Sequence, residues 1–120
     1  MTEADVWPEE LRIQDQGRNL QVKFQSGEEH TLSAEFLRVE SPSAEVKGHG
    51  PGQEQLVFGK RNVVIKKVEP VGSYAIRLIF SDGHDTGLFT WPYLAKLGRS
   101  KAELWLAYET KLTNASRSRD

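Results

Sequence analysis

Runs of alternating apolar and polar residues, joined by tight turns, restrict the fold of this chain more than any other feature. Leu20, Val22 and Phe24 alternate with polar residues, which is the period of a half-buried strand. Similar strand-like runs occupy residues 62–71 and 73–80. Because the helical patterns follow the strands instead of alternating with them, the sequence predicts an α+β fold. We expect a small single domain, mainly antiparallel sheet with hairpins, with two or three short helices.

The pair Asp82–Gly83 follows one of these runs and predicts a two-residue type I′ turn, in which both central residues have positive φ. In that register Ile76 faces Phe89 across the hairpin. The face expected to be buried carries Tyr74, Ile76, Leu78, Phe80 and Phe89. His84 then falls on the opposite face, at the rim of the sheet, where solvent reaches it.

Capping residues mark the start of three short helices. Ser33 is a good N-cap for a helix that Pro42 prevents from continuing. Pro92 stands in the first turn of the second helix. Ser100 and Glu103 have the spacing of a capping box at the start of the third.

The length of 120 residues fits one domain. We expect residues 1–9 to form a flexible lead-in, residues 10–112 to fold, and the polar residues 113–120 to be a disordered tail. Glycine and proline are concentrated within residues 41–62, which indicates a long loop. Loops of this length in small domains are often functional.

Composition excludes several classes of function. Acidic and basic residues nearly balance, with a formal net charge of −1, so no field of one sign favours general nucleic-acid binding. The chain has no cysteine, which removes disulfides, thiolate nucleophiles and cysteine metal sites. No stretch approaches the roughly 20 apolar residues that cross a bilayer, and the acidic start lacks the pattern of a signal peptide. We therefore expect a cytoplasmic protein without membrane attachment. An exposed strand edge would allow a dimer, although nothing in the sequence requires one.

Two histidines are candidate ligands for a metal ion. His84 stands between Asp82 and Asp85 in the hairpin, and carboxylates and imidazole are metal ligands that a turn can bring together. His49 lies among glycines that allow close backbone approach to a ligand. The simpler interpretations are a solvated hairpin residue for His84 and a mobile loop for His49.

No pattern of residues indicates catalysis. The serines lie in caps and turns, and no G-x-S-x-G nucleophile elbow is present. The neighbouring carboxylates Glu28 and Glu29 lie on one exposed turn, without an apolar pocket to separate their acidities. We therefore expect that the chain is not an enzyme.

Three stretches resemble a known family: "LRVESPSAEVKGHG", "VVIKKVEPVGSYAIRLIFSDGHDTG" and "WPYLAKLG". They are similar to the gamma-butyrobetaine-hydroxylase-like N-terminal domain family, a domain of unknown function, over roughly residues 8–98. The resemblance implies a small α+β domain that occurs in three settings. It stands alone in bacteria, it precedes the iron- and 2-oxoglutarate-dependent oxygenase domain of carnitine-biosynthesis hydroxylases, or it is attached to P-loop ATPases that carry iron–sulfur clusters.

In the hydroxylases this family domain binds a structural zinc ion through three cysteines and one histidine. By position, the resemblance places those ligands at Ser41, Ser43, Val46 and His84. Serine is a poor zinc ligand at neutral pH and valine is none, so the thiolate zinc site is not retained. His84, with His49 or Glu45, is left as a set of ligands for a weaker, exchangeable metal ion. No cofactor is otherwise implied.

The resemblance favours a non-enzymatic accessory or interaction domain that serves iron–sulfur cluster assembly or the maturation of a metalloenzyme. The expected partner is an iron–sulfur carrier ATPase or a metalloenzyme. The alternatives are a metal- or small-ligand-binding domain that uses His84 and His49, and a separate subunit of a 2-oxoglutarate-dependent oxygenase. The expected interaction surface comprises Ser41, Pro42, Ser43, Glu45, Gly48, His49, Asp82, His84 and Asp85.

Overall fold

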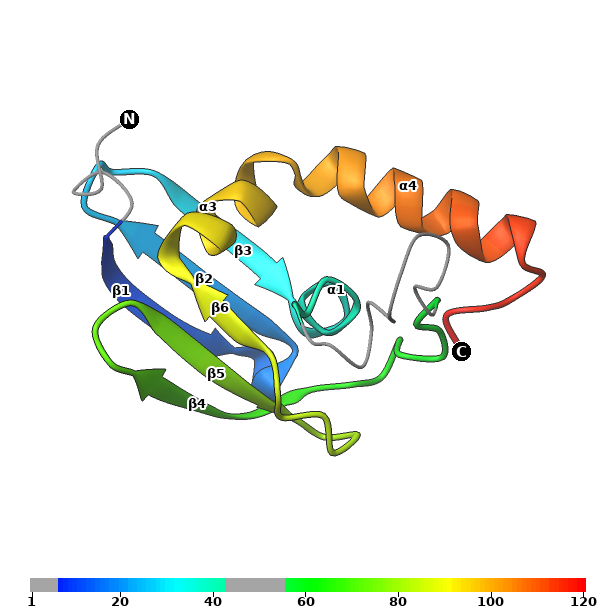
Figure 1. Cartoon of the computed structure of the whole chain (residues 1–120), viewed down its shortest axis with the longest axis horizontal. Coiled ribbons are helices and arrows are strands. Elements are labelled where there is room, and N and C mark those ends of the chain that lie inside the picture. Colours follow the sequence, from blue (N-terminus) through cyan, green and yellow to red (C-terminus); the bar gives the residue numbers. More distant parts are fainter. Residues whose placement is uncertain (1–6, 43–55) are drawn as a thin grey trace.

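The computed structural model describes residues 7–42 and 56–120 and contains two three-stranded antiparallel sheets (Figure 1). The first sheet has the order β1-β2-β3 and the second the order β4-β5-β6. The strands are β1 (Pro8–Gln14), β2 (Asn19–Phe24), β3 (Glu29–Ser33), β4 (Ile65–Val71), β5 (Ala75–Phe80) and β6 (Leu88–Thr90). The α+β class and the antiparallel hairpins expected from the sequence are confirmed.

The described helices are α1 (Ala34–Val39), α3 (Trp91–Arg99) and α4 (Lys101–Asn114). The Ser33 hydroxyl accepts a hydrogen bond from the Phe36 N–H at 3.0 Å, so this residue caps α1 as expected. Ser100 makes no side-chain cap for α4. Ser100 is the C-cap of α3, where its N–H donates to the Lys96 carbonyl at 2.9 Å, and its ψ of 17° is not the extended conformation of a capping N-terminal residue. None of the described helices has the length and apolar character needed to cross a bilayer.

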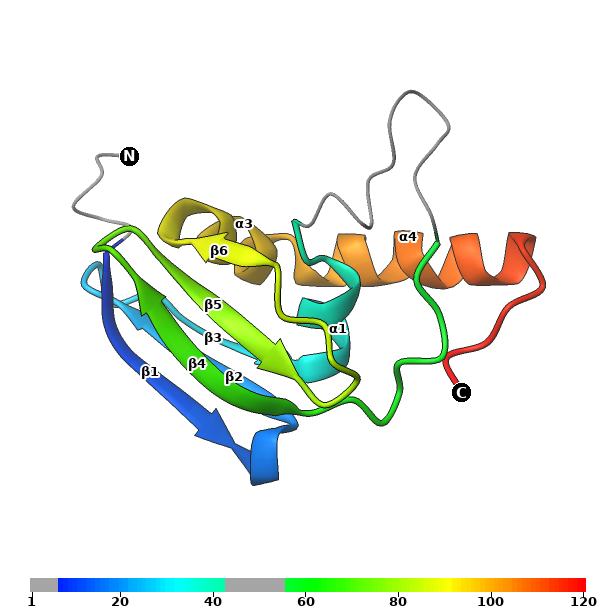
Figure 2. The same ribbon diagram turned by 60° about the horizontal axis from the view of Figure 1, so that its bottom comes forward.

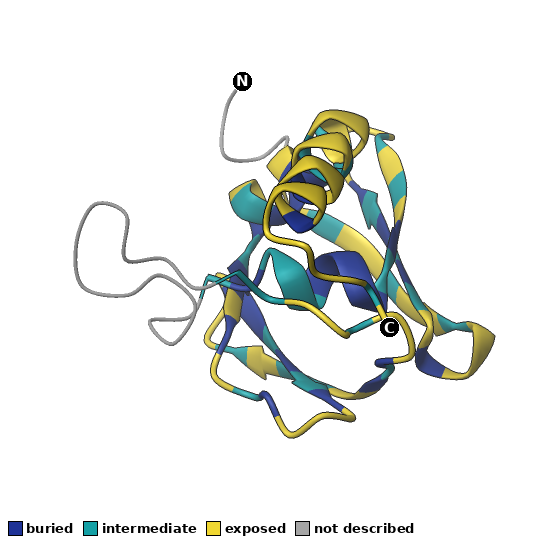
Figure 3. Cartoon of the chain, turned by 90° about the vertical axis from the view of Figure 1, so that its right-hand side faces the viewer, coloured by how far each residue is buried: buried dark blue, intermediate teal, exposed yellow. Residues whose placement is uncertain are grey.

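Both sheets, α1 and α3 contribute to one hydrophobic core. The largest fully buried side chains are Phe24, Phe80, Phe89, Leu20, Leu32, Leu37, Ile76, Leu78, Leu94, Leu97 and Val22. The colouring by burial shows buried residues along the strands and in α1, whereas α4 is mostly exposed (Figure 3). Ile76 pairs with Phe89 as expected, but Tyr74 precedes β5 and is 53% exposed, so it does not belong to the buried face.

The structure describes residues at both of the expected chain ends, namely 7–9 and 113–120. β1 begins at Pro8, within the expected lead-in. α4 extends to Asn114, and the segment after it folds back onto the domain (Figure 2). There the Arg119 guanidinium binds Glu35 through Nε and Nη2, each 2.8 Å from one carboxylate oxygen. The polar segment 113–120 thus contains a residue whose partner, Glu35, lies elsewhere in the fold.

An ion cluster joins the turn between β2 and β3 to the end of α3. Arg99 donates from Nε to Glu28 Oε2 at 2.9 Å and from Nη2 to Oε1 at 2.7 Å, while His30 contacts the same carboxylate. The Arg99 hydrogen bond outweighs desolvation and, with the contribution of His30, lowers the pKa of Glu28 from 4.5 to about 2. The folded state therefore binds a proton at Glu28 less readily than the unfolded chain does.

This difference in pKa predicts how stability depends on pH. The stabilisation from Glu28 is fully present above about pH 4.5 and is lost as the pH falls toward 2. We expect Glu28→Gln to remove about 1 kcal/mol of unfolding free energy at pH 6 and much less at pH 3. Urea unfolding of both proteins at the two pH values measures this. The matched control is Glu29→Gln, and an equal loss at both pH values for Glu28→Gln would contradict the prediction.

Candidate functional site at the β5–β6 turn

The turn between β5 and β6 encloses three residues instead of the expected two. Phe80 donates its N–H to the His84 carbonyl, and Gly83 donates to the Phe80 carbonyl, both at 3.0 Å. Gly83 has a φ of 91°, whereas Asp82 does not enter the positive-φ region, so the turn is not type I′. The pairing expected from the sequence is restored only at Leu88, which faces Arg77.

His84 is buried because of this shift, with only 6% of its surface exposed. A shift of one residue along a strand moves a side chain to the other face of the sheet. The expectation that His84 lies at the solvated rim is therefore wrong. Its ring centre lies 6.1 Å from that of Phe80, and its Nε2 lies 2.9 Å from Ser41 Oγ, with which it shares a hydrogen bond.

Gly87 makes the space in which Ser41 meets the turn. A Cβ atom built at Gly87 would lie 1.9 Å from Ser41 Oγ, which is closer than any side chain allows. Ser41 itself is only 3% exposed. The chain after α1 and the turn after β5 are thus fitted to each other, with Ser41 between Gly87 and His84.

Charged groups surround Asp82 at the outer side of the turn. Its Oδ2 accepts from Arg38 Nε at 2.8 Å and from Lys60 Nζ at 2.6 Å, and its Oδ1 accepts from the His84 backbone N–H at 3.1 Å. Burial alone would raise the pKa of Asp82, but the hydrogen bonds from Lys60, Arg38 and the His84 backbone outweigh it and lower the pKa to about 2. Asp82 therefore stays ionised and joins three segments of the chain.

The pair of Ser41 and His84 contains the atoms of a nucleophile and its base but lacks access for a substrate. Both residues are buried, and Gly87 packs directly against the serine hydroxyl. A nucleophile needs a reacting atom about 3 Å away, and Gly87 lies on that approach to Ser41 Oγ. The Asp82 carboxylate binds the His84 backbone and two cations, an arrangement that is not that of a catalytic triad.

The structure brings together only part of the expected site. Ser41 and His84 share a hydrogen bond, Pro42 follows Ser41, and Asp82 and Asp85 lie on the turn with His84. The other expected residues, Ser43, Glu45, Val46, Gly48 and His49, lie outside the described residues. Within residues 7–42 and 56–120, no three histidine, cysteine or acidic side chains gather as a metal site requires.

Sequence reasoning missed Arg38, Lys60 and Gly87 as parts of this site. Arg38 lies 44 residues before Asp82 and Lys60 lies 22 residues before it, so no local pattern joins them. The glycine that follows the DGHDT stretch was a usable signal, because a glycine outside the tight turn often marks close approach of another segment.

Comparison with known proteins places the chain among related domains. Residues 11–95 match the profile of the family described as gamma-butyrobetaine hydroxylase-like, N-terminal. One NMR solution structure is 46% identical, with a TM-score of 0.81, and the match covers 94% of this chain and 89% of that one. A second NMR structure is 43% identical, with a TM-score of 0.81 and coverage of 99% and 89%. No curated protein matches the sequence.

A crystal structure from Acidithiobacillus ferrooxidans ATCC 23270 is also similar and belongs to a protein with unknown function of the DUF971 family. It is 40% identical to this chain, with a TM-score of 0.67, and the match covers 81% of this chain and 98% of that one. The matched range of the family profile includes both Ser41 and His84.

The tight fit at Gly87 yields a prediction for stability. We expect Gly87→Ala to lower the unfolding free energy by about 1–3 kcal/mol, because its methyl group overlaps Ser41 Oγ. Ser41→Gly removes that oxygen, so the double variant should lose about 1 kcal/mol less than the sum of the single losses. Urea unfolding of the four proteins measures the coupling. Gly27→Ala, which meets no atom within 4 Å, is the control and should not couple to Ser41→Gly.

Proposed function

Since the chain belongs to the gamma-butyrobetaine hydroxylase-like N-terminal family, we propose that it is a non-enzymatic interaction domain. The observation that carries the proposal is the closed Ser41–His84 pair. Its serine and histidine are buried and bound to each other, so neither is presented to a substrate. Outside that pair lies a rim of charged residues formed by Arg38, Lys60 and Asp82, whose side chains leave 12%, 23% and 20% of their surface open to a partner.

We propose that the rim, together with Pro42 and Asp85, docks on a protein of iron–sulfur cluster assembly or metalloenzyme maturation. The choice of partner rests on the resemblance to domains that are attached to cluster-carrying ATPases. The charges of the rim support a protein partner, because paired side chains on three segments present a preformed polar surface.

We expect the tagged protein, crosslinked in extract of its own cells, to recover an iron–sulfur carrier ATPase that mass spectrometry identifies. Asp85→Arg should reduce the recovery at least ten-fold, because one reversed charge at a docking surface weakens association. Glu9→Arg, an exposed reversal in β1, is the matched control and should recover as much as the unaltered protein. Recovery of a 2-oxoglutarate-dependent oxygenase instead would select that alternative, and an equal loss with both reversals would contradict a specific surface.

The donor set at Ser41 and His84 does not fit a structural zinc ion, because it offers one imidazole and a hydroxyl where thiolates are needed. The 2.9 Å contact nevertheless places two of the four positions implied by the resemblance together. A designed chain with cysteines at positions 41, 43 and 46 therefore tests whether these positions and His84 correspond to the zinc site of the hydroxylases.

We expect the triple variant S41C/S43C/V46C to bind one zinc ion and to gain unfolding free energy when zinc is added, since structural zinc stabilises the folded state directly. Atomic absorption after desalting and thermal unfolding with and without zinc measure this. Adding His84→Ala to the triple variant should abolish both effects. Tight zinc binding by the unaltered chain, detected by a shift of the His84 and His49 NMR signals, would instead support the metal-binding alternative.

A further inference from the structure

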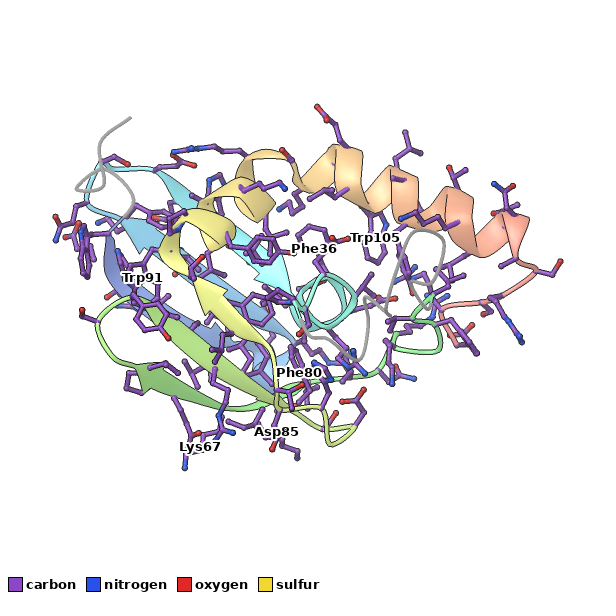
Figure 4. The ribbon with its side chains drawn as sticks, in the orientation of Figure 1. Phe36, Lys67, Phe80, Asp85, Trp91 and Trp105 are labelled. Carbon is purple, nitrogen blue, oxygen red and sulfur yellow. The ribbon has the colours of Figure 1, made fainter. Side chains whose placement is uncertain are left out.

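A groove lies between the start of α1, strand β3 and helix α4. Its volume is about 460 Å³, and it is lined by Asn19, Thr31, Ser33, Glu35, Phe36, Lys101, Ala102, Trp105 and Arg119. Phe36 and Trp105 lie between α1 and α4 (Figure 4), with ring centres 6.3 Å apart in an edge-on arrangement. The groove thus combines an aromatic wall with charged groups.

Glu35 is the group in this groove that most needs a partner. Its side chain is only 7% exposed, and Arg119 satisfies it with a two-pronged contact, Nε to Oε2 and Nη2 to Oε1, both at 2.8 Å. The guanidinium of Arg119 also lies 5.1 Å from the centre of the Trp105 ring. A planar guanidinium matches a carboxylate and an aromatic face at once, which an ammonium group does not. Glu35 and Trp105 therefore form a recognition site for an arginine side chain.

Residues 115–120, the C-terminal segment, bring Arg119 to this site. The Ser118 and Arg119 carbonyls accept hydrogen bonds from the backbone of Gly59 and Arg61, at 3.0 and 2.9 Å. Arg61 also binds Asp120 through its side chain. The C-terminal segment thus lies beside residues 59–61, held there by two backbone hydrogen bonds in addition to its contacts with α4.

The connection between α4 and the C-terminal segment is strained. Arg117 donates its N–H to the Leu112 carbonyl at 2.9 Å and Ser116 to that of Thr113 at 3.1 Å, which is the helix ending that favours glycine at the left-handed position. Ser116 holds that position with a φ of 55°. A non-glycine residue there costs free energy. That free energy is released if Ser116 leaves this conformation, so that Ser116 acts as a hinge between α4 and the C-terminal segment.

We propose that this arginine site also accepts Arg119 from a second copy of the chain, so that two copies exchange their C-terminal segments. The known occupant of the site is the chain's own segment, so a second copy offers the same contacts without any new complementarity. Opening the hinge at Ser116 directs the segment away from its own groove, and reciprocal exchange satisfies both Glu35 carboxylates. Short strained hinges of this kind favour such exchange.

Cysteine pairing tests the exchange directly, because the chain has no native cysteine. Arg61 and Asp120 contact each other through exposed side chains, so Arg61→Cys on one chain and Asp120→Cys on another face each other only after exchange. The two full-length variants are mixed in equal amounts, incubated at high concentration, and then diluted and oxidised. We expect at least ten times more of the mixed disulfide, which joins the cysteine at position 61 to the cysteine at position 120, than of either symmetric disulfide.

Further variants separate exchange from chance contact. Arg119→Ala on the Asp120→Cys chain should abolish the excess, and Arg119→Lys, which keeps the charge and restores folding if the alanine variant unfolds, should also reduce it. Ser116→Gly should lower the dimer fraction in sedimentation velocity by at least about five-fold, because it relieves strain in the closed hinge. Ser116→Pro should raise it, since proline cannot adopt that φ.

Two results would overturn the proposal. One is the absence of an Arg119-dependent excess: the mixed disulfide is no more abundant than the symmetric disulfides, or its excess over them persists with Arg119→Ala. The other is a protein that stays monomeric over about a hundred-fold range of concentration while added arginine ethyl ester changes its Trp105 fluorescence. That outcome would assign the site to an arginine of a different protein.

Discussion

Ser41 Oγ and His84 Nε2 share the hydrogen bond on which the arrangement around the β5–β6 turn depends. The two residues are 43 positions apart and both are buried, so neither can exchange its partner for water. A buried polar group left without a partner costs about 1–3 kcal/mol, which is more than the bond itself contributes. Each residue therefore requires the other, and the pair fixes the chain after α1 against the turn. Gly87 is required for the same reason, because any larger residue would separate them.

Two carboxylates near α1, Asp82 and Glu35, are each held by cations from other segments. Asp82 remains ionised although it is partly withdrawn from water, because cations from two other segments donate to it. Glu35 is more deeply buried and receives a guanidinium from a residue 84 positions away. Removing one partner from such a pair leaves a charge in a poorly solvated place, which destabilises far more than the pair itself stabilises. These contacts therefore act mainly as constraints on which segments meet.

Local rules predicted the parts of the fold that depend on neighbouring residues. The alternation in β2, the cap at Ser33 and the pairing of Ile76 with Phe89 all follow from residues close together in the sequence. The position of His84 could not be predicted, because one extra residue in the turn changes its face without changing the later register. The contact of Arg119 with Glu35 was not predicted, since it joins residues 84 positions apart and is entirely tertiary. The long-range pairs form the candidate site, and apart from the signal of Gly87 the local patterns do not predict them.

The absence of cysteine changes how such a turn is held. In the hydroxylases that the chain resembles, a structural zinc ion is expected at the corresponding place, and structural zinc contributes on the order of 10 kcal/mol to folding. One hydrogen bond contributes only about 1 kcal/mol, so the Ser41–His84 pair cannot replace the ion alone. The contacts of Asp82 with Arg38 and Lys60 are two further connections between the turn and other segments of the chain. When a zinc ion leaves, its four ligand contacts break together, whereas separate polar contacts can break one at a time. Because each contact can break without the others, the loss of one leaves the rest of the charged rim in place, and this supports the proposed docking surface without requiring a bound ion.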